Sequence, residues 1–265
     1  MELQFLIIDP QRDFCEPNGA LYVNGAKDDS LRTAAMIRRL GEKIDNIRIT
    51  LDSHHNVDIA HPLFWQDSAN GQHPAPFTII TAEDVAKGRY ITTNPAFLKR
   101  ATEYVNRLKD NSRYPLCIWP PHCLIGSWGH AIQEDIFNAV SAWELKCFAM
   151  AEMITKGSNF WTEHYSAIQA DVPDPEDPGT LLNTDLIKAI ESADLIAVMG
   201  QAKSHCLANT VRDIADNFGE GSIKKLWLIE DCASNVTGFE NLGEAFVKDL
   251  KARGMNVTTS KEFLA

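Results

Sequence analysis

Several side chains that could do chemistry together stand where apolar runs of the chain end. They are Asp9, Asp52, His122, Lys156 and Cys206. Cys206 lies in GQAKSHCLANT, and a thiol at a helix N-terminus beside an ammonium group such as Lys156 is favoured as the nucleophilic thiolate. Asp9 could accept the thiol proton and return it to a leaving amine. Taken singly, each residue also has an ordinary role, as a turn carboxylate, a surface lysine or a core thiol.

The elements that must position these residues alternate between apolar runs and amphipathic stretches. Continuous apolar runs predict buried strands at 5–9, 47–52, 116–119, 147–153, 195–200 and 226–231, and 256–260 could add an edge strand. Helical periodicity before the second run and after the fifth predicts helices between the strands. The pattern therefore predicts an α/β, single-domain, three-layer fold, with a mostly parallel six-stranded sheet covered by helices on both faces. In such sheets ligands bind at the carboxyl ends of the strands, so the reactive residues should share one edge.

Composition narrows the class of protein. The chain has 265 residues, 45% of them hydrophobic, which suits one domain spanning 1–265. A net charge of −11 without a basic block argues against nucleic acid as a partner. No apolar run is long enough for a membrane span, and six scattered cysteines without a CxxC pattern indicate reduced thiols, so we expect a soluble cytoplasmic protein.

Two segments interrupt the alternation of strands and helices. Residues 53–113 are rich in Pro, Gly and His and contain one predicted helix, at 95–109, while 171–180 is acidic and rich in proline. We expect an insertion at about 65–113 that serves as a lid over the site or as a contact in a homo-oligomer. A surface excursion without a role is the alternative.

The histidines suggest a metal site. LDSHHNVDIAHP places Asp52, His54, His55 and His61 within ten residues, and WPPHC adds His122. Imidazole and carboxylate ligands together suit a first-row divalent ion with water in the open positions. A surface cluster of histidines is the alternative.

Five motifs together resemble the nicotinamidase/isochorismatase-like cysteine hydrolases. They are IDPQRDF, LDSHH…HP, WPPHCLIG, ITKGSNFWTEHYSA and GQAKSHC, in the family's order over nearly the whole chain. The resemblance implies a catalytic triad of Asp9, Lys156 and Cys206. It also implies a metal bound by Asp52, His54, His61 and His122, with zinc expected and iron or manganese as alternatives.

The resemblance implies further roles around the substrate. Phe14 and Trp119 would sandwich the substrate ring, and the N–H groups of Ala202 and Cys206 would form the oxyanion hole. A cis peptide would lie between Gln201 and Ala202. Gln201 departs from the small aliphatic residue usual there, and we place it in the substrate-binding set.

Three functions remain open at this point. The first is a metal-dependent nicotinamidase, a hydrolase of a linear amide that forms a thioester on Cys206. The second is an amidohydrolase of another small amide or carbamoyl compound, and the third is a non-catalytic binding member of the fold. Isochorismatases proper lack the nucleophilic cysteine, so Cys206 favours amide hydrolysis.

Overall fold

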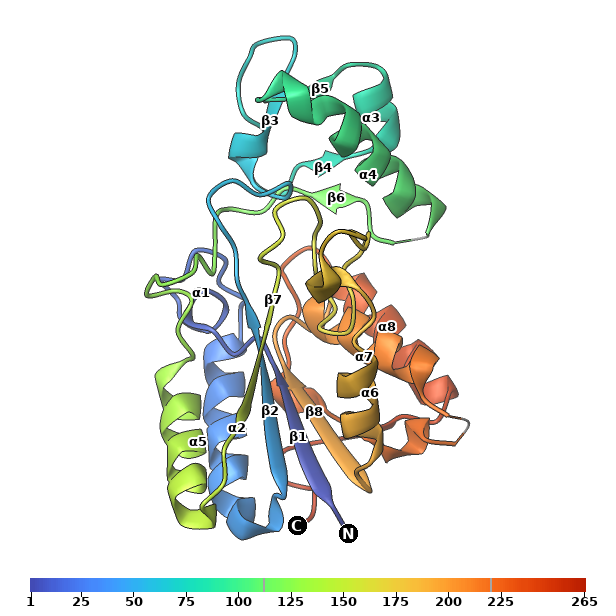
Figure 1. Cartoon of the computed structure of the whole chain (residues 1–265). Helices are drawn as coiled ribbons and strands as arrows, with labels where there is room; N and C mark the ends of the chain where they lie inside the picture. Colours follow the sequence, from blue (N-terminus) through green and yellow to red (C-terminus); the bar gives the residue numbers. More distant parts are fainter. Residues whose placement is uncertain (112, 220) are drawn as a thin grey trace.

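A six-stranded parallel sheet forms the centre of the computed structural model, which describes residues 1–111, 113–219 and 221–265 (Figure 1). Its strands are β1 (Leu3–Ile8), β2 (Asn46–Asp52), β7 (Glu152–Lys156), β8 (Leu195–Gly200), β9 (Leu226–Ile229) and β10 (Asn256–Thr258). They lie in the order β10-β9-β8-β1-β2-β7, and every neighbouring pair is parallel. The predicted α/β fold with a mostly parallel six-stranded sheet is confirmed.

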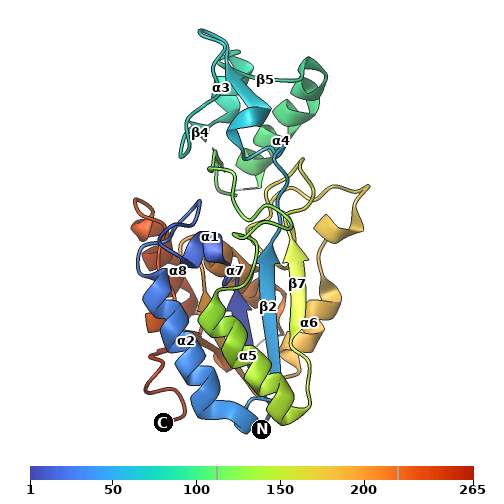
Figure 2. The same cartoon turned by 90° about the vertical axis from the view of Figure 1, so that its left-hand side faces the viewer.

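Helices cover both faces of this sheet (Figures 1 and 2). One face carries α2 (Ala26–Leu40) and α5 (Glu134–Cys147), and the other carries α6 (Thr184–Glu191), α7 (Cys206–Asn217) and α8 (Glu240–Ala252). Successive side chains of β1 alternate between the two cores: Phe5 and Ile7 pack in the core of α2 and α5, whereas Leu6 and Ile8 pack in the core of α7 and α8. Burial on both faces explains why the strand sequences are continuously apolar. Among the described residues, no helix has the length and apolar content that a membrane crossing needs.

Residues 62–111 and 113–117 form a small lobe beyond the carboxyl ends of the strands (Figure 1). We call it the insertion lobe. Its elements are β3 (Trp65–Asp67), β4 (Ile79–Ile80), α3 (Ala82–Ala86), β5 (Tyr90–Thr92), α4 (Leu98–Asp110) and β6 (Leu116–Cys117). β3 pairs with β5 and β4 with β6, both antiparallel. Short 3-10 turns lie at Gly41–Lys43, Pro62–Phe64, Pro95–Phe97, Pro178–Thr180, Ile223–Lys225 and Glu230–Cys232.

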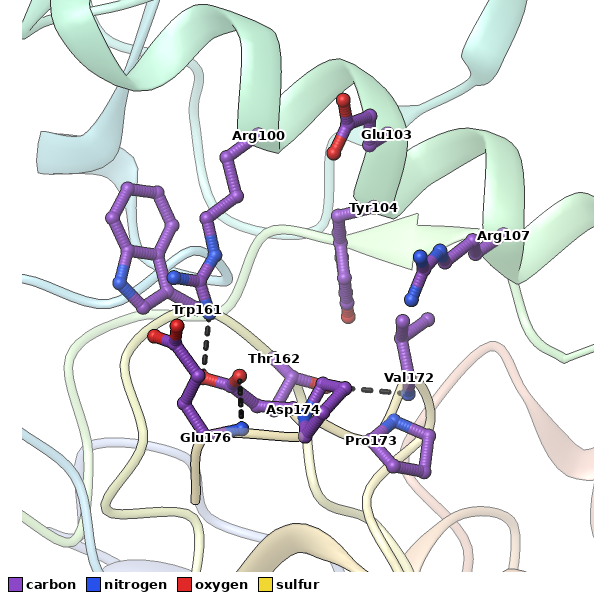
Figure 3. Close-up of a pocket in the computed structure, with 11 residues that line it drawn as sticks. Arg100, Glu103, Tyr104, Arg107, Trp161, Thr162, Val172, Pro173, Asp174 and Glu176 are labelled. Atoms are coloured by element: carbon purple, nitrogen blue, oxygen red, sulfur yellow. Dashed lines mark hydrogen bonds and ion pairs between the residues drawn. The ribbon is translucent and has the colours of Figure 1, made fainter.

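Polar contacts hold the insertion lobe to the acidic loop at 171–180 (Figure 3). Arg100 of α4 lies with its guanidinium carbon 4.4 Å from the ring centroid of Trp161, and its Nη2 is 2.6 Å from Asp174 Oδ2. A cavity of 380 Å³ lies between α4 and this loop, and none of the predicted site residues lines it. This cavity is therefore separate from the chemistry expected at the strand ends.

Two predicted strands are wrong in part. The run at 116–119 forms only the short strand β6, which pairs with β4 in the insertion lobe instead of joining the main sheet. The run at 147–153 begins as the last residue of α5 and turns through Phe148, whose φ is 52°, before β7 starts at Glu152. Its apolar side chains signalled burial, but Phe148 and Met150 are exposed beside an edge strand. The possible strand at 256–260 is instead the sixth strand of the sheet, β10.

Gly200 sets how closely β8 approaches β1. Its φ is +114°, and a Cβ at this position would lie 2.1 Å from the carbonyl oxygen of Ile8. We expect Gly200→Ala to lower the free energy of unfolding by at least about 2 kcal/mol, because the main chain of two central strands would have to separate. Urea unfolding measures this change.

Gly254→Ala is the matched control. Gly254 has a similar φ of +108°, but nothing lies within 4 Å of the added Cβ. A loss of stability as large at Gly254 as at Gly200 would show that backbone conformation, and not the contact with Ile8, causes the effect.

Candidate active site

The sheet topology brings four of the predicted residues to one edge. Asp9 directly follows β1, Asp52 and Lys156 are the last residues of β2 and β7, and Cys206 is the first residue of α7, which follows β8. β2 and β8 flank β1, and Asp52 is the register partner of Lys156. All four side chains therefore meet at the carboxyl end of the parallel sheet.

Lys156 is the centre of this group. Its buried Nζ lies 2.9 Å from Asp9 Oδ2, 2.9 Å from Asp52 Oδ1 and 3.7 Å from Cys206 Sγ. Burial lowers the pKa of Lys156, but the charges of Asp52 and Asp9 outweigh it and hold that pKa well above its usual value. The lysine therefore stays charged, and the two carboxylates are the partners that a buried ammonium group requires.

Asp9 is placed to act as a proton acceptor for the thiol. Its Oδ1 accepts a hydrogen bond from the Thr50 hydroxyl, and one of its carboxylate oxygens lies within 4.8 Å of Cys206 Sγ. Burial raises the pKa of Asp9, while the charge of Lys156 lowers it, and the pKa stays above its ordinary value. A raised pKa makes the carboxylate a better base.

Two opposing effects act on the pKa of the Cys206 thiol. Burial raises its pKa well above the ordinary value, although Lys156 lowers it. The ammonium group favours the thiolate, as expected, but the loss of solvation in so buried a site acts in the opposite direction and is the larger effect. A nucleophilic role for Cys206 therefore needs a base such as Asp9.

A second group of side chains adjoins the first. Ligand atoms of Asp52, His54 and His122 all lie within 4.8 Å of one another. Asp52 Oδ2 is 3.1 Å from His54 Nε2 and 3.4 Å from His122 Nε2. Two atoms bound to one zinc ion at about 2.0–2.1 Å lie roughly 3 Å apart, so this spacing fits a shared metal.

Hydrogen bonds orient each imidazole ring for metal binding. In each ring, Nδ1 lies within hydrogen-bond distance of an oxygen: Asp58 Oδ2 at 3.0 Å for His54, the His55 carbonyl at 3.1 Å for His61, and the Pro120 carbonyl at 2.8 Å for His122. Donation from Nδ1 leaves Nε2 free to bind a cation. In the described part of the chain, the buried Nε2 atoms of His54 and His61 have no hydrogen-bond partner, as expected of ligand atoms.

The charge around His54 also favours a cation. Burial lowers the pKa of His54, but Asp52 and Asp58 outweigh it and hold that pKa well above the usual value. The negative potential that favours a proton there favours a metal ion equally.

His61 lies beside this group and not within it. Its ring centroid is 5.2 Å from that of His54 and 5.6 Å from that of His122. His55 is exposed and lies outside the cluster. The structure thus brings three of the four predicted metal ligands together and places the fourth next to them.

A small pocket is lined by both Cys206 and His122. It has a volume of 20 Å³ and is lined by Phe14, Leu21, Asp52, Trp119, His122, Glu163, Tyr165, Ala202, His205, Cys206 and Val236. We call it the catalytic pocket. Phe14 belongs to the short helix α1 (Arg12–Cys15), and Trp119 donates its Nε1–H to the Tyr165 hydroxyl at 2.9 Å. The volume holds about one water molecule, so an aromatic ring enters only if the walls move apart.

The turn before Cys206 has the expected cis peptide in its main chain, but the side chain of Gln201 does not point where we expected. The peptide between Gln201 and Ala202 is cis. Among the residues described, the main-chain N–H groups of Ala202 and Cys206 donate no hydrogen bond. The Gln201 side chain, however, donates to Asp29 Oδ2 at 2.9 Å and accepts from the Ser234 N–H at 3.3 Å, away from the catalytic pocket. Its predicted place in substrate binding is therefore not supported by its orientation.

Several residues of the site escaped the sequence analysis. Thr50 and Asp58 orient Asp9 and His54, and Glu163, Tyr165 and His205 line the catalytic pocket. Asp58 follows His54 by four residues, and this short spacing could have predicted their contact from the sequence. The others act through contacts between distant segments, which spacing in the sequence does not reveal.

Comparison with known proteins agrees with this geometry. No protein-family model matches the chain. The nicotinamidase of Saccharomyces cerevisiae is 21% identical over 254 residues, which cover 95% of this chain and 97% of the relative.

Solved structures show the same fold. The yeast nicotinamidase bound to the inhibitor nicotinaldehyde has a TM-score of 0.67 at 18% identity, covering 97% of this chain and 99% of that one. A nicotinamidase/pyrazinamidase of Acinetobacter baumanii has a TM-score of 0.65 at 19% identity, covering 99% and 98%. A pyrazinamidase of Pyrococcus horikoshii in complex with zinc has a TM-score of 0.56 at 19% identity, covering 98% and 99%.

A parallel sheet with an Asp-Lys-Cys group at its carboxyl edge is the arrangement that the resemblance to the nicotinamidase/isochorismatase-like cysteine hydrolases led us to expect. The curated nicotinamidase matches the chain over nearly its whole length, and the solved nicotinamidases and pyrazinamidases have the same fold, so the chain is similar to proteins of that class from end to end.

Removal of the Lys156 charge tests the ion pairs at the centre of the site. We expect Lys156→Met to lower the free energy of unfolding by about 3–5 kcal/mol near neutral pH, because Asp9 and Asp52 lose their buried partner. Burial raises the pKa of Asp52, but His54 and Lys156 outweigh it and hold that pKa well below the ordinary 3.8. A lowered folded-state pKa contributes stability above the unfolded value that is lost as the pH falls through the folded one. The deficit of the variant should therefore shrink from about pH 7 to about pH 3, as followed by urea unfolding.

Lys109→Met is the control, because Lys109 forms an exposed ion pair with Glu83. It should change stability little at any pH. A Lys156→Met deficit that does not depend on pH would contradict the electrostatic explanation.

Proposed function

We propose that this protein is a metal-dependent cysteine amidohydrolase that converts nicotinamide and water to nicotinate and ammonia through a thioester on Cys206. The observation that carries the proposal is the buried Lys156 Nζ, which contacts Asp9, Asp52 and Cys206 beside a cluster of metal-type ligands. Hydrolysis of a linear amide is also the activity named for the curated relative and the solved neighbours.

In the proposed reaction Asp9 carries the proton and Cys206 is the nucleophile. Asp9 takes the proton from Cys206 as Sγ attacks the amide carbon, and the N–H groups of Ala202 and Cys206 stabilise the oxyanion. Asp9 then gives the proton to the departing nitrogen, which leaves as ammonia. In the second half of the reaction Asp9 takes a proton from water as the water oxygen attacks the thioester carbon, and it returns that proton to the departing Cys206 sulfur. The thiol re-forms, and the product leaves as the carboxylic acid, which then ionises to the carboxylate. Lys156 stays charged throughout and offsets the negative charge that develops between Asp9 and Sγ.

Asp52, His54 and His122, with His61 beside them, would hold the divalent ion. When bound, such an ion supplies a Lewis-acid contact for the ring nitrogen of the substrate. Zinc is the expected metal, because mixed imidazole and carboxylate ligands suit it and the Pyrococcus horikoshii neighbour is described in complex with zinc, while iron and manganese remain alternatives. Phe14 and Trp119 line the pocket from separate segments and would hold the ring in place for attack.

A smaller amide or carbamoyl compound is the second candidate substrate. The 20 Å³ volume of the catalytic pocket favours it, since a small amide needs less movement of the walls than an aromatic one. A non-catalytic binding role is disfavoured by the complete contact network around Lys156.

Two further assignments remain predictions. We infer one hydrolase domain with an insertion at about 65–113, and a homo-oligomer in the cytoplasm. Exposed apolar side chains at Leu145, Phe148 and Met150, near edge strand β7, fit an oligomer contact.

Ammonia release across a panel of amides tests the reaction and its nucleophile. Nicotinamide should give the highest kcat/KM among nicotinamide, pyrazinamide, benzamide, simple aliphatic amides and carbamoyl compounds. Cys206→Ala should lower kcat by at least about a thousandfold while the protein stays folded, because the covalent route is lost. Cys147→Ala, at a half-buried cysteine at the end of α5, is the control and should retain activity. A higher kcat/KM on an aliphatic amide would favour the second candidate, and an active Cys206→Ala would exclude the thioester.

Metal content tests the ligand set separately from activity. His54→Ala should lose the bound ion in elemental analysis, whereas His55→Ala, the exposed neighbour, should keep it. Asp58→Ala should weaken metal binding by about 10–100-fold, because the carboxylate orients His54. Full occupancy in His54→Ala would mean that the ion is held elsewhere.

A further inference from the structure

A second pocket adjoins the catalytic pocket and has no part in the mechanism above. It has a volume of 340 Å³ and is lined by Ile79, Tyr114, Pro115, Cys117, Tyr165, His205, Gly238, Phe239, Asn241 and Leu242. We call it the side pocket. It lies between the insertion lobe and the segment that leads into α8, and its lining is mainly apolar.

His205 and Tyr165 line both pockets. His205 directly precedes Cys206 in the chain, and both residues line the catalytic pocket. The catalytic pocket measures 20 Å³ and the side pocket 340 Å³, and His205 and Tyr165 are the residues that line both.

The His205 ring is held firmly in place. Its Nδ1 lies 2.9 Å from Ser204 Oγ, which in turn accepts the Val236 N–H at 3.1 Å, so the Ser204 proton is free to bond the ring nitrogen. Four aromatic rings enclose it, with centroids at 4.9 Å for Phe239, 5.1 Å for Trp119, 5.3 Å for Tyr165 and 5.6 Å for Tyr114. Burial lowers the pKa of His205 to about 3, so the ring is neutral and packs among aromatic groups without a charge to solvate.

We propose that His205 is a specificity-determining residue that sets the size of the amide, because its ring closes the catalytic pocket off from the side pocket. Without the ring, the two pockets form one site for an aromatic amide that carries an apolar substituent. The lining of Ile79, Pro115, Phe239 and Leu242 would accept an alkyl or phenyl group and disfavour a charged one. This inference rests on the proposed function.

The experiment compares kcat/KM for nicotinamide with kcat/KM for nicotinamides that carry a methyl, propyl or phenyl group on the ring. The wild-type protein should discriminate against the larger substituents. His205→Ala should raise the ratio of substituted to unsubstituted amide by about tenfold or more, since apolar pocket contacts of this size are worth that much. His205→Phe keeps an aromatic wall and should leave the ratio near that of the wild type.

The ratio does not depend on the fraction of active enzyme, so partial unfolding of a variant does not imitate the effect. His205→Val serves as a second small variant if His205→Ala is poorly folded. A ratio within about twofold of the wild type in both small variants, or a wild type that takes the phenyl compound as well as nicotinamide, would overturn the proposal.

A substitution in the side pocket tests whether the substituent of the amide enters that pocket when the His205 ring is removed. Leu242 is half-buried at the side pocket and does not line the catalytic pocket. Leu242→Trp alone should leave nicotinamide turnover unchanged, and in the His205→Ala background it should return the ratio to the wild-type value. A gain that persists in the double variant would show that the substituent lies elsewhere.

Failure of the proposed function gives a different result from failure of this inference. If nicotinamide is not hydrolysed at all, the proposed function fails. The same ratios are then measured with the amide that the panel identifies and its propyl and phenyl derivatives, and they support or overturn the role of His205 independently.

Discussion

The buried ammonium group of Lys156 is the constraint on which the site depends. It contacts Asp9, Asp52 and Cys206, and each of these comes from a different strand end or helix start. Because a buried charge is tolerated only with close partners, this one group requires β1, β2 and β7 to end at the same level and α7 to begin beside them. The parallel sheet satisfies that requirement through its strand order, with β2 between β1 and β7.

Asp52 joins the two halves of the site. Its Oδ1 lies against Lys156, and its Oδ2 lies against the Nε2 atoms of His54 and His122. One carboxylate therefore balances the charge of the lysine and offers a ligand atom to the histidine cluster. The proposed nucleophile and the candidate metal ligands are thus set at a fixed spacing by a single side chain on a rigid strand.

The groups that would carry out the reaction and the residues that would select the substrate come from different parts of the molecule. The groups that would carry protons and charge stand on strand ends and on the first turn of α7, where the sheet holds them rigidly. The walls of the catalytic pocket come from other segments: Trp119 and His122 after β6, Tyr165 after β7, and His205 before α7. Loops on a rigid scaffold can vary in shape without loss of the central ion pairs, which fits the role inferred for His205.

The sequence by itself determined the class of fold and the positions of Asp9, Asp52, Lys156 and Cys206 at one sheet edge. Continuous apolar runs report burial on both faces, and parallel strands place their carboxyl ends together, so this much follows from local pattern. Only the tertiary structure decided which elements the runs at 116–119 and 147–153 form. A hydrophobic run does not show which strand it pairs with, or whether it lies at the edge or in the centre of a sheet. Through-space contacts also decided the site's finer properties. Gln201 turns towards Asp29, and His61 lies beside the cluster. Burial raises the pKa of Cys206, since a pKa depends on charges and solvation that residues far apart in sequence supply.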